Sequence, residues 1–124
     1  MLSRRTALVS VAGAALAGNL TGQPKVAMYG LIGKMKALPG KRDELASAVL
    51  ARSSAMPGCL SYVVAKDPED ADALWVTEVW DSEASHKASL SLPAVNEAIA
   101  KGRPLIASFG EYHTTEPIGF HSGK

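Results

Sequence analysis

The sequence predicts an α+β domain in which four strands form one antiparallel sheet and two helical segments cover one of its faces. The segments 59–66 and 73–80 alternate in character and are rich in β-branched and aromatic residues, which is typical of strands. The segment 41–56 instead repeats its apolar residues with helical spacing. A chain of 124 residues fits one domain with a modest core.

The first half of the domain is a predicted strand–helix–strand unit. Residues Val26–Ala37 form the first strand, in which Gly30 and Gly33 indicate a bulge or the close approach of another segment. The helix over 41–56 follows and ends at Pro57–Gly58, which leads into the second strand. The apolar side of this helix carries Leu45, Ala48, Val49 and Met56.

The second half repeats the strand–helix–strand order. Residues Ala73–Trp80 form the third strand, and Asp81–Ser82 caps the next helical segment. Pro93 interrupts that segment, because proline fits only the first turn of a helix, so a second piece begins there and ends at Gly102. Residues 105–115 form the fourth strand.

This order, βαββαβ, predicts a ferredoxin-like arrangement, in which right-handed crossovers place both units in one four-stranded sheet. Both helical segments then cover the same face, and the opposite face is bare. Because an apolar sheet face is not stable in water, we expect a homodimer with sheet packed against sheet.

The first residues predict an export leader. A basic start with Arg4 and Arg5 precedes a short apolar run that ends in Ala15–Ala17, the small-x-small pattern of a cleavage site. The run is too short to cross a bilayer of about 30 Å, so we expect no membrane anchor. The arginine pair is similar to a twin-arginine signal, although a general secretory signal also fits.

The leader sets the predicted domain division and location. We expect an export signal and linker over 1–24, the folded domain over 25–117 and a polar tail over 118–124. The location would then be periplasmic, or cytoplasmic if the leader is not used.

The charge, cysteine and histidine content argues against several classes of protein. The net charge is +1, and removal of the leader would leave 11 basic against 12 acidic residues, so nothing favours nucleic acid as a partner. Cys59 is the only cysteine, which excludes an internal disulfide and predicts a small apolar residue at the start of a strand. The histidines 86, 113 and 121 lack the spacing of metal ligands.

Three segments together resemble the antibiotic biosynthesis monooxygenase domain family, which includes small quinol monooxygenases and haem-degrading relatives. They are PGCLSYVV at 57–64, WVTEVWDSEASH at 75–86 and Leu92–Val95, and the resemblance extends over about Tyr29–Pro117. It implies a dimeric α/β barrel with a cavity between sheet and helices. There, activated phenolic or anthrone-type rings would react with O₂ as co-substrate, with no metal or flavin cofactor.

Such a reaction needs a base, a donor to the developing oxyanion and exclusion of water. His86 is the candidate base, because its unperturbed pKa lies near neutral pH. It follows Trp80 by six residues, a spacing that can return the ring toward the end of the third strand across the turn into the helix. A surface or helix-capping role for His86 is the structural alternative.

Two aromatic residues complete the catalytic candidates. Trp80 shares a strand face with Glu78, and it would form a flat wall for an aromatic substrate if that face points at the helices. Tyr62, on the second strand, would donate a hydrogen bond to the oxyanion. Plain core packing is the alternative for both.

The substrate-binding candidates come from several elements. Glu78 lies inside a strand and needs a partner: it would orient His86, contact a substrate hydroxyl, or pair with Lys34 or Lys36. The remaining candidates are aromatic lining residues and one amide: Tyr29, Phe109, Tyr112 and Asn96.

Three functions therefore stay open at this stage. The first is a cofactor-independent monooxygenase that acts on a quinol- or anthrone-like aromatic. The second is a binding module of the same fold that holds a small aromatic or haem without turnover. The third is a dimer with a filled cavity and a purely structural role. Haem-degrading relatives use an inward polar residue on the first strand, and no Asn is present over 28–37, so haem breakdown is the weaker option.

Overall fold

The structure is a computed structural model that describes residues 26–51 and 56–121. The predicted leader over 1–24 lies outside these residues, so its export role stays a prediction. In chain order the elements are β1 (Tyr29–Ala37), α1 (Arg42–Ala51), β2 (Cys59–Lys66), β3 (Ala73–Trp80), α2 (Glu83–Ser89), α3 (Pro93–Gly102), the 3₁₀ turn η1 (Arg103–Leu105) and β4 (Ile106–Thr115).

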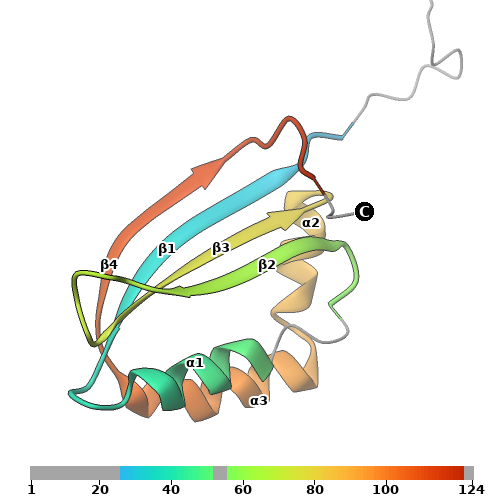
Figure 1. Ribbon diagram of the computed structural model, residues 1–124. Helices are drawn as coiled ribbons and strands as arrows, with labels where there is room; N and C mark the ends of the chain where they lie inside the picture. The colour runs from blue at the N-terminus through green and yellow to red at the C-terminus, as the bar shows by residue number, and fades with distance from the viewer. Residues whose placement is uncertain (1–25, 52–55, 122–124) are drawn as a thin grey trace, which may run out of the picture.

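The four strands form one sheet in the order β2-β3-β1-β4, with every neighbouring pair antiparallel. All three helices lie on the same side of this sheet, with α1 and α3 side by side beneath it (Figure 1). This is the ferredoxin-like α+β arrangement that the element order predicts, so the fold-class prediction is confirmed.

Most element boundaries agree with the sequence, and the differences have local causes. Strands β2 and β3 begin and end at the predicted residues, and the second helix breaks at Pro93 as expected. The first strand begins at Tyr29 rather than Val26, because pairing with β3 starts only there. The first helix reaches Ala51 in the described residues, and the prediction that it continues to Met56 is wrong, since Met56 is not helical.

The alternation of β3 decides which side chains face the helices. Val76, Glu78 and Trp80 are buried on the helical side, whereas Thr77 and Val79 are half-buried on the opposite face. Successive side chains of a strand point to opposite faces, so the predicted division of this strand is confirmed.

Two clusters of buried side chains hold the helical layer to the sheet. One joins Ala37, Leu45 and Leu74 near the β1–α1 turn, and the other joins Met56, Trp80 and Val95. Half-buried residues pack against each cluster, among them Val49 on the first and Tyr62 on the second. The layer is therefore fixed at two separate places, and the space between them is available for a cavity.

Two glycines permit close approach in the sheet and at its end. A Cβ at Gly30 would collide with the side chain of Thr115 on β4, and a register shift follows between Gly33 and Met35. Gly58 has a φ of 87°, and its carbonyl accepts a 2.8 Å hydrogen bond from the amide of Asp81. The bulge or close approach predicted for β1 is confirmed.

None of the helices over residues 26–51 and 56–121 has the length and apolar character that a transmembrane helix requires.

Candidate functional site

A cavity of about 240 Å³ lies between the sheet and the helices. All four strands contribute to its wall, together with Val49 of α1 and two residues of the α2 region. The lining residues are Leu31, Gly33, Lys34, Met35, Val49, Tyr62, Val76, Glu78, His86, Leu90, Phe109, Gly110, Glu111 and Tyr112.

A buried carboxylate forms part of the floor of the cavity. Glu78 is 9% exposed, and its Oε1 accepts a 2.9 Å hydrogen bond from Nε1 of Trp80, two residues away on the same face of β3. The indole thus supplies a partner that a carboxylate inside a strand requires. Lys34 and Lys36 form ion pairs with Asp67 and Asp70 instead, so the expected pairing of Glu78 with either lysine is wrong.

Helix α2 brings His86 to the cavity. Its N-cap is Ser82, whose Oγ accepts a hydrogen bond from the Ser85 amide at 3.1 Å, so the predicted cap is confirmed. The His86 ring lies 5.4 Å from the Trp80 ring in an edge-on arrangement, and also 5.4 Å from the Tyr29 ring. The helix therefore returns the imidazole over the end of β3, as the six-residue spacing predicts.

Two tyrosines line the same cavity from different strands. The Tyr62 hydroxyl donates a 3.4 Å hydrogen bond to the carbonyl of Val49, which ties β2 to α1. The pKa of Tyr112 is raised from its ordinary value, first by burial around the hydroxyl and then by the charges of Tyr29 and Glu78. Tyr112 therefore stays protonated, and able to donate a hydrogen bond, at neutral pH.

The cavity opens along β4. Phe109 is 74% exposed and Tyr112 is 63% exposed, yet both lie in the cavity lining. Their strand partners are Met35 and Gly33 of β1, which also line the cavity, so both rings project from the helical face of β4. They form an aromatic rim at the entrance.

Three of the residues selected from the sequence lie outside this lining: Tyr29, Trp80 and Asn96. Trp80 is fully buried, so it supports Glu78 and His86 from behind and does not form the flat wall that we expected. Asn96 is exposed on α3, next to the buried Val95, so its expected role as a polar contact in the cavity is not supported. Tyr29 reaches the site through its contact with the His86 ring.

Sequence reasoning missed the aliphatic part of the wall, above all Val49 and Leu90. Leu90 follows His86 by four residues, and side chains at this spacing share one face of a helix. The spacing from His86 could therefore have predicted that Leu90 lines the cavity. Val49 was assigned to the apolar side of its helix, but nothing local distinguishes a cavity-facing residue from one in the packed core.

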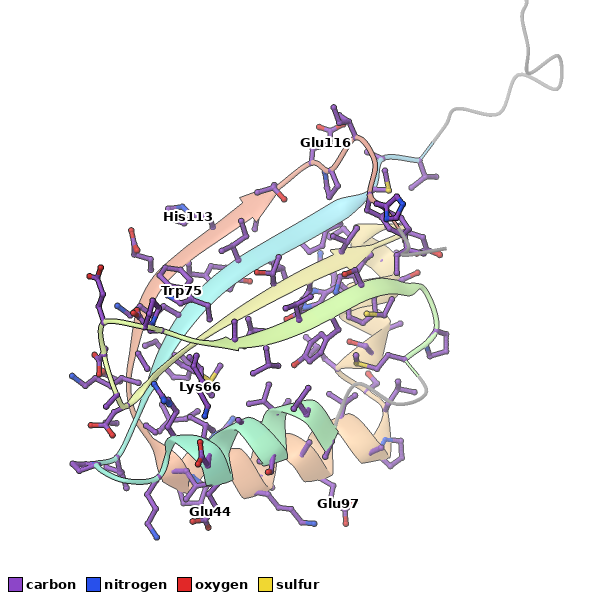
Figure 2. All side chains as sticks on the ribbon, in the orientation of Figure 1. Glu44, Lys66, Trp75, Glu97, His113 and Glu116 are labelled. Carbon is purple, nitrogen blue, oxygen red and sulfur yellow. The ribbon has the colours of Figure 1, made fainter. Side chains whose placement is uncertain are left out.

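Outside the cavity, three labelled side chains mark solvent-facing surfaces of the molecule (Figure 2). Glu44 and Glu97 point away from the sheet below the helices, and His113 lies at the outer side of β4. Across residues 26–51 and 56–121, no three His, Cys, Asp or Glu side chains group together as a metal site would require.

Comparison with known proteins places this geometry in a family. The sequence profile of the antibiotic biosynthesis monooxygenase family matches residues 28–101. A structure from Chloroflexus aurantiacus, described provisionally as an antibiotic biosynthesis monooxygenase, is 65% identical over 77% of this chain and 97% of its own, with a TM-score of 0.75. The chain therefore belongs to the antibiotic biosynthesis monooxygenase family.

More distant structures share the fold. One from Caulobacter crescentus is 20% identical, with a TM-score of 0.69 over 77% of this chain and 93% of its own. One from Nitrosomonas europaea is 12% identical, with a TM-score of 0.68 over 77% of this chain and 95% of its own. A search of curated proteins gave no match to the sequence.

Proposed function

We propose that this protein is a cofactor-independent monooxygenase that oxidises a quinol- or anthrone-like aromatic with O₂. The observation that carries the proposal is one cavity in which the imidazole of His86, the carboxylate of Glu78 and the phenol of Tyr112 meet aromatic and aliphatic walls. Membership of a monooxygenase family agrees with this chemistry.

The size of the cavity suits a ring-shaped substrate. An apolar cavity of about 150 Å³ accepts benzene, and the cavity here measures about 240 Å³ and opens at the aromatic rim. Phe109 and Tyr112 offer ring faces and edges to a flat guest. A one- or two-ring aromatic is the substrate class that fits.

The reaction begins with removal of a proton. His86 takes the proton of a substrate hydroxyl, and the carboxylate of Glu78 stabilises the imidazolium that forms. Tyr112 donates a hydrogen bond to the oxygen that becomes negative. The electron-rich anion then reduces O₂, and for a quinol one oxygen atom enters the ring of the resulting hydroxyquinone while the other leaves as water.

The test is O₂ consumption by the full chain with 1,4-naphthoquinol, with the uncatalysed rate subtracted and incorporation of ¹⁸O followed by mass spectrometry. We expect His86→Ala to lose about 100-fold in rate, the usual contribution of a general base. His113→Ala is the matched control, because His113 is exposed and pairs with Ile32 on the opposite face. Equal rates for His86→Ala and the wild type would remove His86 as the base.

A second candidate function is binding of a small aromatic without turnover, since the same walls serve either role. It is favoured by the 3.4 Å hydrogen bond that already occupies the Tyr62 hydroxyl. Saturable binding of naphthoquinone together with absence of ¹⁸O in the product would support this function over the first.

We also propose that the protein works as a homodimer packed through the bare face of the sheet. Val63 is 51% exposed and lies opposite Thr77, so an apolar side chain stands exposed on that face, on the edge strand β2. Val63→Asp should convert the dimer to a monomer in light-scattering measurements. Ala100→Asp, on the exposed side of α3, is the control that should leave the mass unchanged.

Export is a further proposal, which rests on the basic and apolar sequence over 1–17. Fusion of residues 1–24 to a reporter that is active only after export tests it. Lysine in place of both Arg4 and Arg5 should abolish twin-arginine export but leave general secretion intact.

A further inference from the structure

A second, apolar hollow lies next to the candidate site. It measures about 150 Å³ and is bounded by α1, α3 and the beginning of β4. Small residues of the two helices create it: Ala48 on α1, and Ala98 and Gly102 on α3. The two helices run side by side beneath the sheet (Figure 1). We call this hollow the annex.

The annex shares a wall with the cavity of the candidate site. Met35, Val49 and Phe109 line both spaces. Each of these side chains is apolar, and the methionine is flexible enough to adapt to a guest that extends past it. A ligand in the cavity therefore meets no polar barrier between the two spaces.

The lining of the annex selects an apolar guest. Among its lining residues the charged one is Arg103, and that side chain is exposed. Water in such a space finds few hydrogen-bond partners, whereas an apolar cavity of about 150 Å³ binds a group the size of benzene. Because benzene has six carbon atoms, a space of this volume should hold an alkyl chain of about five or six carbon atoms.

We propose that the annex binds an alkyl or prenyl substituent of the substrate, so that the substrate class is an aromatic quinol with a short apolar side chain. The placement of the ring in the cavity rests on the proposed function, but binding in the annex is measurable without turnover. The ring occupies the space beside Glu78 and His86, and the side chain passes Met35 into the annex.

The experiment is calorimetric titration of the full chain with 2-methyl-3-alkyl-1,4-naphthoquinones of increasing chain length. Both reactive ring positions are substituted in these compounds, so the Cys59 thiol does not add to them. Each buried methylene should lower the Kd about fourfold until the annex is full at about six carbons, and the Kd should then stay level.

Ala48→Leu fills the annex and is the decisive variant. It should remove the dependence on chain length while the Kd of the 2,3-dimethyl compound stays unchanged. Ala100→Leu adds the same side chain on the exposed side of α3, outside the lining, and should keep the full dependence. This control separates the annex from unspecific attraction between long chains and the protein.

Gly102→Ala keeps the test valid if the leucine variant does not fold. A Cβ there would lie 3.5 Å from Leu45 Cδ1 and 3.7 Å from the Cβ of Ala48, which are ordinary contacts. The chain length at which Kd levels off should shorten by about one carbon.

The two proposals fail in different ways. A Kd that does not change with chain length would rule out binding of the side chain in the annex, whether or not the protein is an oxygenase. The same dependence of Kd on chain length in Ala48→Leu as in the wild type would rule it out as well. Dependence on chain length that Ala48→Leu removes, together with no ¹⁸O incorporation, would support the annex and reject the oxygenase.

Discussion

Strands β3 and β4 lie on either side of β1 in the same sheet, yet they differ sharply in how far their side chains are buried. Five residues of β3 are buried and the other three are half-buried, whereas nine of the ten residues of β4 are exposed. The difference follows from position in the sheet, because the helices pack mainly against β1, β2 and β3, whereas β4 is an edge strand with little helical cover.

Buried side chains of β3 hold the fold, whereas exposed side chains of β4 line the opening of the cavity. Trp80 is fully buried in a core cluster, whereas Phe109 shows 74% of its surface to solvent. A large exposed ring contributes little to folding, and exposed apolar groups beside a cavity often mark a binding site. The stable floor of the site thus comes from β3, and its entrance comes from β4.

The largest predicted effect concerns stability. Leu74→Ala on β3 should lower the free energy of unfolding by about 3 kcal/mol, because it leaves a cavity in a packed cluster. Phe109→Ala on β4 should change it by less than about 0.5 kcal/mol. Urea denaturation measures both values, and equal losses would mean that β4 is packed in solution as tightly as β3.

The second prediction tests the buried pair on β3. Trp80→Phe removes the indole N–H and leaves Glu78 buried without that partner, which should cost about 2 kcal/mol of stability. In a double-mutant cycle, Glu78→Met, which removes the acceptor, and Trp80→Phe should show a coupling of about 1 kcal/mol. Strictly additive losses would show that the hydrogen bond does not stabilise the fold.

The third prediction sharpens the role of the β4 rim. Phe109→Ala should weaken the binding of 2,3-dimethyl-1,4-naphthoquinone about tenfold, which corresponds to about 1.4 kcal/mol. Ser108→Ala is the control, because Ser108 pairs with Lys36 and lies on the opposite face. Unchanged affinity in the phenylalanine variant would place the guest elsewhere.

The smallest predicted effect is a pH dependence at the loop between β2 and β3. The Glu69 amide and then Lys34 lower the pKa of Asp67, and the Asp72 amide and then Lys36 lower that of Asp70. Because both pKa values fall on folding, their stabilisation is present above the ordinary pKa of Asp and is lost as pH drops through the lowered values.

Thermal melts of Asp67→Asn test this sign. The variant should be slightly less stable than the wild type at pH 7, and the gap should close as pH falls below about 4. Both carboxylates lie near the surface, so salt should also reduce the gap. A gap that is constant from pH 7 to pH 3 would contradict the assignment.

The sequence was sufficient for the elements whose signals are local. Alternation placed β3 and its two faces, and Pro93 placed the break between α2 and α3. Helical spacing also separates the exposed Asn96 from the buried Val95 and Ala98, so the error over Asn96 was avoidable. The non-helical state of Met56 was also predictable, because Met56 precedes Pro57 and a residue before proline is disfavoured in a helix.

The cavities depend on packing between distant segments, so the sequence did not specify them. Trp80 was expected to face the helices, and it does, but full burial resulted from contact with Met56 and Val95. The annex arises where Ala48 and Gly102, which are far apart in sequence, meet between two helices. No local pattern distinguishes small residues that leave a space from small residues that allow close packing.

Backbone amide shifts during titration of the ¹⁵N-labelled protein with 2,3-dimethyl-1,4-naphthoquinone test most directly whether the space between sheet and helices receives an aromatic guest. We expect saturable shifts concentrated at Tyr62, Glu78, His86, Phe109 and Tyr112. Shifts confined to the opposite face of the sheet, at Val63, Thr77 and His113, or no saturable shifts at all, would contradict this expectation.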